Sequence, residues 1–353
     1  MLLVELYERQ GDITSAMDLI EPTAVIHPRD PRVLLTLARI QMEAGKERDA
    51  IDTLRKLVEI APDSHKAYIL LSMVQMKQQQ HEAARSSLEQ AVKLQPDSPV
   101  ARVMLAQLDI SAKDYKTALA VAQELRETYP DAVYGYELAG DVYTAQAEYK
   151  QAADAYAQAY DKEHSAQLTK KRYQALRKNG EHKAARQVLA QWLAEEPDDI
   201  VVRSMLASAL QSQGLNTEAI EQYLYILGRD RDNVSALNNI AWCYQEQGIP
   251  DGLKYAERAH VLAPDRPEVI DTLGWLLVKN GDTNRGLVLL QEASVKAPHI
   301  PEIRYHMAVA LAKAGRRDES RMVLDRLLRT GKDFQGVDEA RKLREQLGDY
   351  VQK

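Results

Sequence analysis

The chain has 353 residues, of which 46 are basic and 52 are acidic, and its formal net charge is −6. This balance provides no global positive field for nucleic acid or an anionic membrane, and a single cysteine excludes an internal disulfide or a cysteine-based zinc site. The sequence has no run of 18 apolar residues and predicts no transmembrane segment. Its first residues do not follow the pattern of a secretory signal peptide. The fold class has to come from the spacing of the apolar residues.

Residues 1–62 predict short amphipathic helices that come in pairs. The first ten residues, MLLVELYERQ, form one helical face with apolar side chains. In residues 32–62 the i, i+3, i+4, i+7 spacing occurs twice, once on each side of Gly45. Gly45 supplies the backbone freedom of a tight turn, and Pro62 ends the second helix. Because so small a hairpin cannot bury its apolar face alone, the sequence predicts further copies beside it.

A 34-residue period continues through the chain. It is marked by proline at positions 28, 62, 96, 130, 197, 264 and 298. Twelve residues before each mark lies a small side chain: Ala16, Ala50, Ala84, Ala118, Ala152, Ala185, Ala219, Gly252, Gly286 and Ser320. A second, mostly small series lies another twelve residues earlier: Val4, Ala38, Ser72, Ala106, Gly140, Tyr173, Ala207, Ala241, Gly274 and Ala308. We expect both series where two helices cross closely.

A helix–turn–helix period of this length, with small residues and proline at these offsets, resembles the tetratricopeptide repeat family. The resemblance covers nearly the whole chain and implies an all-α solenoid of about ten repeats in a right-handed superhelix, with a C-terminal capping helix. The expected repeats are residues 1–30 (incomplete), 31–64, 65–98, 99–132, 133–166, 167–199, 200–233, 234–266, 267–300 and 301–334, followed by a cap helix and tail at 335–353.

The two ends of the repeat array differ. The chain opens in the middle of a repeat, whereas solenoids need caps with a polar outer face. We therefore expect that a natural N-terminal part, including any export signal, precedes residue 1. At the other end, Val337, Ala340, Leu343 and Leu347 share one face of a charged helix, which is the pattern expected of a cap.

The sequence contains no motif for catalysis or cofactor binding. His81 and Glu82 begin like HExxH, but Arg85 stands where the second zinc ligand belongs. There is no glycine-rich phosphate loop and no GxSxG. We expect the eight scattered histidines at the surface and Cys243 as a buried, inert thiol. The sequence thus predicts a protein that is not an enzyme and that uses no metal or cofactor.

The chain has one concentrated basic patch, in residues 167–183. Its candidate ligand-binding strip is Lys170, Arg177 and Lys178. Such a run is usually a solvated helix face. The alternative is an anion-binding strip for an acidic peptide or a polysaccharide.

The resemblance also implies a binding groove, because positions 2, 5, 9, 12 and 13 of the first helix of each repeat face the concave side in tetratricopeptide repeats. The rule selects Ser235, Asn238, Trp242, Gln245 and Glu246 in one repeat, and Glu268, Asp271, Trp275, Val278 and Lys279 in the next. The predicted site consists of Asn238, Trp242, Gln245, Asp271 and Trp275, with the two tryptophans side by side. Indoles flanked by an amide and a carboxylate suit a peptide backbone or a sugar ring. Alternatively, the tryptophans only pack one repeat on the next.

Residues 236–328 show a narrower resemblance. The runs ALNNIAWCYQEQG, VIDTLGWLLVKNGD and AVALAKAGRRDESRMVLDRLL are similar to the C-terminal repeats of the tetratricopeptide-repeat lipoprotein of the PEP-CTERM/exosortase system. The resemblance implies a periplasmic, lipid-anchored scaffold whose partners are proteins or peptides of an envelope exopolysaccharide machinery. Two other functions stay open: a module that binds polysaccharide or another anionic ligand directly, and a cytosolic adaptor.

Overall fold

The computed structural model describes residues 2–331, 333–334 and 336–348, and within them the chain consists of helices, without any strand. The helices are α1 (Leu2–Arg9), α2 (Ile13–Ile26), α3 (Pro31–Glu43), α4 (Glu47–Ile60), α5 (His65–Lys77), α6 (His81–Leu94), α7 (Pro99–Ser111), α8 (Tyr115–Thr128), α9 (Tyr134–Ala145), α10 (Tyr149–Lys162), α11 (Ala166–Lys178), α12 (His182–Glu195), α13 (Ile200–Gln211), α14 (Asn216–Arg229), α15 (Val234–Glu246), α16 (Gly252–Leu262), α17 (Pro267–Lys279), α18 (Thr283–Lys296), α19 (Pro301–Lys313), α20 (Arg317–Arg329) and α21 (Val337–Leu347). This architecture confirms the predicted all-α repeat fold.

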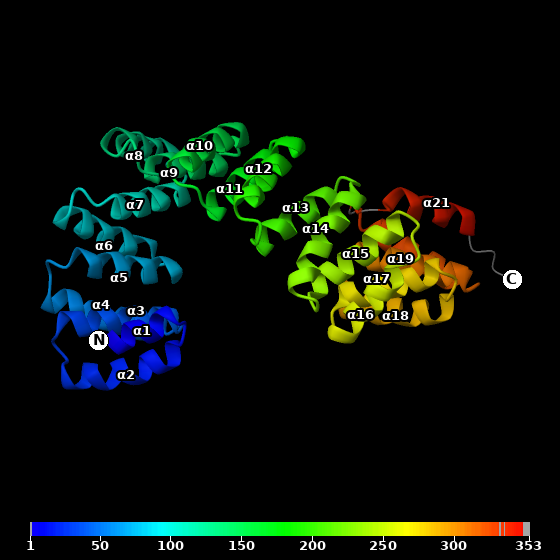
Figure 1. The fold of residues 1–353 in the computed structure, drawn as a ribbon, viewed down its shortest axis with the longest axis horizontal. Coiled ribbons are helices and arrows are strands. Elements are labelled where there is room, and N and C mark those ends of the chain that lie inside the picture. The colour runs from blue at the N-terminus through cyan, green and yellow to red at the C-terminus, as the bar shows by residue number, and fades with distance from the viewer. Residues whose placement is uncertain (1, 332, 335, 349–353) are drawn as a thin grey trace. The chain divides into compact units, whose positions relative to one another are not determined.

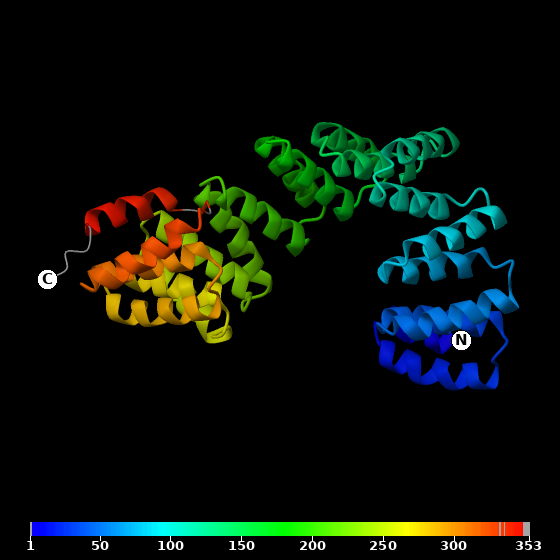
Figure 2. The same ribbon diagram turned by 180° about the vertical axis from the view of Figure 1, so that it is seen from behind.

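The chain divides into two compact units, residues 1–185 and residues 186–353. In the first unit each helix from α1 to α10 contacts its successor, and in the second the same holds for each helix from α13 to α20. Figures 1 and 2 show the consecutive helices of each unit folded back on one another as hairpins. Such contacts between sequence neighbours are typical of a repeat array. The right-handed superhelix and the repeat boundaries stay predictions.

The turn between α3 and α4 shows how the hairpins are closed. Gly45 has a φ of +71° there, a left-handed conformation that glycine adopts without steric cost. Glycine is not required at every such turn, because Gln79, Lys113 and Ala147 have φ values of 59°, 63° and 60° in the turns of three later hairpins. The second helix ends at Ile60, two residues before Pro62, as the sequence predicts.

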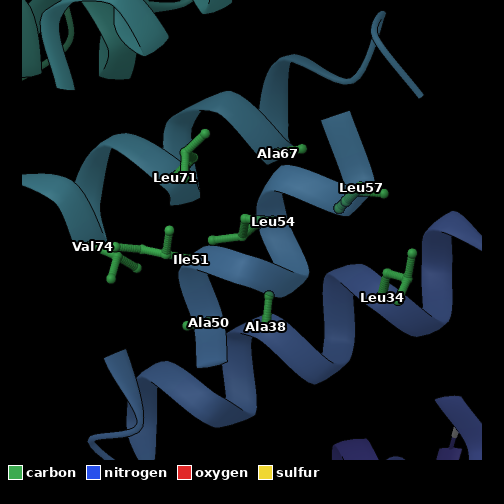
Figure 3. Packing of buried hydrophobic residues seen from close by; sticks show 9 residues of the cluster. All are labelled: Leu34, Ala38, Ala50, Ile51, Leu54, Leu57, Ala67, Leu71 and Val74. Atoms are coloured by element: carbon green, nitrogen blue, oxygen red, sulfur yellow. The ribbon is translucent and has the colours of Figure 1, made fainter. Parts of the chain in front are cut away.

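Both series of small residues lie where helices cross. Ala38 of α3 and Ala50 of α4 are fully buried, and Leu54 and Leu57 fill the space between their helices and α5 (Figure 3). All the other members of both series are buried as well. Gly140 shows why size matters, because a Cβ atom there would lie 2.4 Å from the Tyr156 ring. The helix spacing is thus set by small residues, as the sequence predicts.

The C-terminal helix α21 covers the apolar end of the α19–α20 hairpin. Ala340 is fully buried beside Leu324 and Phe334, and the other three residues of the predicted apolar face, Val337, Leu343 and Leu347, pack against the same cluster. None of the helices in the described ranges is both long enough and apolar enough to cross a membrane.

Candidate functional site

A pocket of about 440 Å³ lies in the second unit, between the first helices of successive hairpins. Its walls come from α13, α15, α17, α19 and the start of α21. The lining residues are Gln211, Asn238, Asn239, Trp242, Glu246, Glu268, Asp271, Thr272, Trp275, Glu302, Tyr305, His306, Gly336 and Glu339. The size is within the range of small-ligand and side-chain pockets.

Four of the five predicted site residues line this pocket. Asn238 and Trp242 come from α15, and Asp271 and Trp275 come from the equivalent positions of α17. Gln245 does not line it and is half-buried on α15. Glu246, four residues after Trp242 and so nearer to it around the helix, lines the pocket instead.

The base of the pocket is a buried pair of polar side chains, Asp271 and His306. The His306 Nδ1 atom lies 2.9 Å from both carboxylate oxygens of Asp271 and donates a hydrogen bond to that carboxylate. The two residues are only 7% and 5% exposed. The expectation that the histidines lie at the surface is therefore wrong for His306, because a carboxylate partner and two indole rings cover it.

Aromatic rings hold His306 in place. Its ring stacks on Trp275 with centroids 4.2 Å apart and an interplanar angle of 21°, and it lies 5.7 Å from the ring of Trp242. Trp275 also contacts Tyr305, with ring centroids 6.3 Å apart. Within the described residues, the predicted pair of indoles is thus connected through the histidine of a third helix.

The two tryptophans differ in exposure. Trp275 is only 7% exposed, so the packing interpretation holds for most of its surface. Trp242 is half-buried and belongs to the same apolar cluster. Of the two indoles, Trp242 is therefore the more accessible from the pocket, while Trp275 supports its base.

Tyr305 and Glu302 are pocket residues that the groove rule would have found if it had been extended by one repeat. Tyr305 follows Asp271 at the repeat spacing, and Glu302 follows Glu268 in the same way. The start of α21 lies next to these α19 residues and completes that wall of the pocket. Gly336 has a φ of +97°, and a Cβ atom there would lie 2.9 Å from the Tyr305 ring, so a larger residue would push the helix away.

The pocket is strongly acidic. Five carboxylates line it, and among its described lining residues there is no lysine or arginine. Glu268 accepts two hydrogen bonds from Arg266. Burial acts to raise the pKa of Glu268, but its own backbone N–H and Arg266 outweigh that effect, and the pKa lies below its usual value. Glu268 therefore remains ionised in mildly acidic solution.

A second pocket of about 440 Å³ adjoins the first. It shares Gln211, Trp242 and Glu246 with the first pocket. Its other lining residues are small or polar and uncharged: Ser208, Ser212, Gly214 and Asn216. The two pockets together form a groove from α13 to the start of α21, with Trp242 at the junction.

In the first unit, the three residues of the predicted basic strip reach the surface to different extents. Arg177 and Lys178 are exposed and Lys170 is half-buried on α11. The Arg177 guanidinium lies 5.9 Å from the Tyr173 ring centroid, and the Lys178 ammonium lies 5.4 Å from that of Tyr149. These three cations are available at the surface of the unit.

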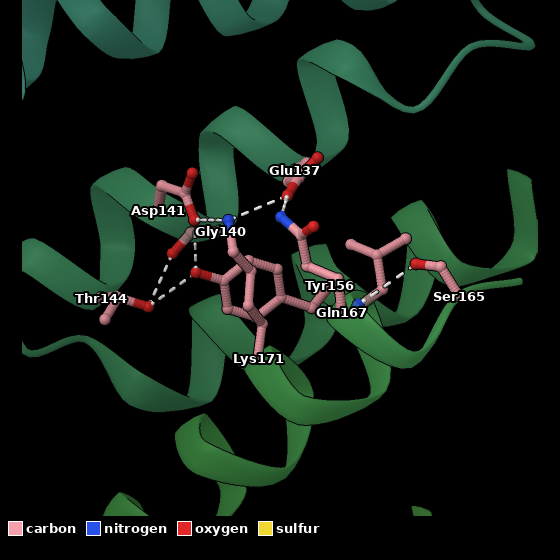
Figure 4. Close-up of polar contacts among 9 residues, drawn as sticks. Glu137, Gly140, Asp141, Thr144, Tyr156, Ser165, Gln167 and Lys171 are labelled. Carbon is pink, nitrogen blue, oxygen red and sulfur yellow. Dashed lines mark hydrogen bonds and ion pairs between the residues drawn. The ribbon is translucent and has the colours of Figure 1, made fainter. Parts of the chain in front are cut away.

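Lys171, in the middle of the same basic run, belongs to an internal polar cluster. Its Nζ atom lies 2.9 Å from a Glu137 oxygen and 2.6 Å from an Asp141 oxygen. The Tyr156 hydroxyl donates to the same Asp141 oxygen at 2.8 Å (Figure 4). The cluster joins α9, α10 and α11, and it removes Lys171 from any strip for external anions.

Cys243 has the buried, inert thiol that the sequence predicts. Cys243 is fully buried, and burial raises the pKa of its thiol to about 12, so it is protonated at neutral pH. Across the described ranges, no group of three or more His, Cys, Asp or Glu side chains is arranged to hold a metal ion.

Comparison with characterised proteins shows partial sequence relatives. The chain is 26% identical over 134 residues to the TPR repeat-containing protein PA4667 of Pseudomonas aeruginosa, a match that covers 35% of this chain and 22% of that protein. It is 31% identical over 161 residues to cellulose synthase operon protein C of Xanthomonas axonopodis pv. citri, covering 43% of this chain and 11% of that protein. The chain thus spans less than a quarter of the length of either relative.

Among solved structures, a chain of the APC/C hetero-tetramer Cut9-Hcn1 is similar in fold. The TM-score is 0.50 with 10% sequence identity, and the match covers 98% of this chain and 89% of the other. The model of the tetratricopeptide repeat family matches residues 7–73, 75–139 and 277–347, which is more than half of the chain. Members of that family bind other proteins or peptides and are typically non-catalytic scaffolds. With its period, its helical hairpins and this match, the chain belongs to the tetratricopeptide repeat family.

Proposed function

We propose that this chain is a non-catalytic scaffold that binds a segment of a partner protein in the groove of its second unit. The observation that carries the proposal is the pocket around Trp242, which has a half-buried indole above a fixed base of Asp271, His306 and Trp275. Such a site is organised before the ligand arrives, so little side-chain entropy is lost on binding. An aromatic anchor with a few oriented polar groups is the usual composition of a binding hot spot.

We further propose that the scaffold serves an exopolysaccharide machinery of the bacterial envelope. Support comes from the partial similarity to cellulose synthase operon protein C and from the resemblance of residues 236–328 to an exopolysaccharide-associated lipoprotein. On this proposal the full-length protein is lipid-anchored in the periplasm. Fractionation of cells that express the complete reading frame tests the location, and recovery in the cytosol would favour the adaptor alternative.

Affinity purification with matched variants tests the binding site. We expect Trp242→Ala to lose the partner that the wild-type chain retains, because the substitution removes the exposed anchor. Gln245→Ala is the control, since Gln245 lies on the same helix outside the pocket wall. The lost partner is then purified and its binding measured directly. If Trp242→Ala is as stable as the wild type and keeps every partner, the groove is not the binding site.

Direct binding of polysaccharide is the second candidate, and the exposed Arg177 and Lys178 on α11 favour it. It predicts that a column of acidic exopolysaccharide retains the wild-type chain, less so at high salt because screening weakens exposed charges. The double variant Arg177→Gln/Lys178→Gln should elute earlier. Unchanged elution of the variant would exclude the strip as a polymer site.

A further inference from the structure

We propose that the pocket around Trp242 receives a lysine or arginine side chain of the partner protein. The inference rests on the proposed function and adds the chemical class of the ligand. It starts from charge: the described walls contain five carboxylates and no lysine or arginine. Clustered like charges repel one another, and a cationic guest relieves that repulsion.

Three of these carboxylates have no internal counter-charge. Asp271 is bound by His306 and Glu268 by Arg266. In contrast, no ion pair or hydrogen bond connects the side chains of Glu246, Glu302 and Glu339 to another described residue. These three side chains belong to α15, α19 and α21, so they approach the pocket from different sides. The arrangement surrounds a guest with unpaired negative charge.

The rings of the pocket suit the same guest. An ammonium or guanidinium group is attracted to the face of an indole or phenol within about 6 Å of its centroid. The molecule already contains one example at this cluster, since the Lys279 ammonium lies 4.5 Å from the Trp275 ring centroid. Trp242 and Tyr305 offer further rings at the pocket wall, and both are incompletely buried.

An unpaired hydrogen-bond acceptor in the pocket wall also favours a guest with N–H groups. The Asn238 side-chain oxygen is buried and accepts no hydrogen bond from any described group. Asn238 lines the pocket beside Trp242. A buried acceptor without a donor is unfavourable, and the N–H groups of lysine or arginine can satisfy it.

A charged side chain of a polypeptide fits better than a metal ion. The described carboxylates do not converge in the way that metal ligands must. The adjoining pocket, lined by Ser208, Ser212 and Asn216, continues from Trp242. Its hydroxyl and amide groups can bind the backbone of the residues that flank the basic side chain. The groove therefore accommodates an extended segment with one anchoring cation.

Four capped nonapeptides of Gly, Ser and Ala test the proposal. They differ only in the central residue, which is Arg, Lys, Gln or Glu, and binding to the full chain is followed by tryptophan fluorescence and saturation-transfer NMR. We expect the Arg and Lys peptides to bind at least about tenfold more tightly than the Gln peptide, with the Glu peptide weakest. Raising the salt concentration from about 50 mM to about 300 mM should weaken the cationic peptides selectively.

Charge-removing variants locate the effect. The double variant Glu302→Gln/Glu339→Gln should lower the affinity for the Arg peptide by about fivefold or more. Glu257→Gln is the matched control, because Glu257 is an exposed carboxylate of the same unit that does not line the pocket. Equal binding of the Arg and Gln peptides, or an unchanged affinity of the double variant, overturns the cation proposal.

The outcomes separate this inference from the proposed function. If Trp242→Ala loses the natural partner but the Arg peptide neither binds nor competes, the groove binds a partner and the cation inference is wrong. If Trp242→Ala keeps the natural partner while the Arg peptide binds to the wild-type chain, the pocket prefers cationic ligands but the proposed function is wrong.

Discussion

Single small residues decide how closely the helices of this chain approach. Ala118 on α8 is fully buried beside Ala106 on α7, in a cluster that Leu125 and Leu138 complete. Protein interiors are close-packed, so there is no free volume for added methyl groups at such a crossing. Two positions away, Lys116 has no such role because its side chain is exposed.

Replacing Ala118 with leucine should lower the free energy of unfolding by about 1–3 kcal/mol, because the larger side chain overpacks the crossing. The matched change Lys116→Leu should alter it by no more than about 0.5 kcal/mol. Urea denaturation followed by circular dichroism measures both. Equal shifts for the two variants would show that the repeat register is misassigned.

At the scale of elements, the polar cluster of Glu137, Asp141, Tyr156 and Lys171 connects three helices from two hairpins. Burial acts to lower the pKa of Lys171, but Asp141 and Glu137 outweigh burial, and the pKa lies above its usual value. Burial and the Asp141 carboxylate raise the pKa of Tyr156 far above that of free tyrosine. Both groups thus keep their protons to higher pH in the folded chain than in the unfolded chain.

Because folding raises the pKa values of Lys171 and Tyr156, the folded chain should lose stability in alkaline solution. The contribution of both groups is complete below their unfolded pKa values of about 10, and it falls as pH rises through that range and beyond. Tyr156→Phe should reduce the dependence of the unfolding free energy on pH between about 9 and about 11, because phenylalanine does not ionise. Tyr149→Phe is the control, since its hydroxyl makes no hydrogen bond to a described residue. An identical alkaline profile for the wild type and Tyr156→Phe would refute the assignment.

The helical fold and the burial of its small residues could be predicted from the sequence because a repeat presents each packing rule many times. The burial of Ala38 and Ala50 follows from spacing alone. The hydrogen bond between Asp271 and His306 could not be predicted in this way, because it connects individual side chains of two different repeats. The availability of the basic residues posed the same problem: only the structure shows that Lys171 is bound to Glu137 of the preceding repeat.

At the scale of the whole molecule, contacts between neighbouring helices dominate. Helices contact their successors in both units, and contacts that skip a helix join first helices such as α15 with α17 and α17 with α19. In such an array stability is approximately a sum of repeat and interface contributions. Damage in one hairpin should then remain local.

Hydrogen exchange can test this locality. In the Ala118→Leu variant, we expect faster amide exchange in α7, α8 and α9, which meet at the altered crossing, and unchanged protection in α17 and α18 of the other unit. Mass spectrometry of peptic fragments measures both regions in one experiment. A uniform loss of protection across the chain would mean that it unfolds as one cooperative body.

The pocket has a further consequence for how this protein can change. Each of its walls is one helix, most of them the first helix of a hairpin, and each helix contributes only a few lining residues. Duplication or loss of one hairpin therefore exchanges an entire wall while the neighbouring interfaces keep their geometry. One recombination event between repeats can therefore produce a new ligand preference. No intermediate variant that fails to fold is needed on the way.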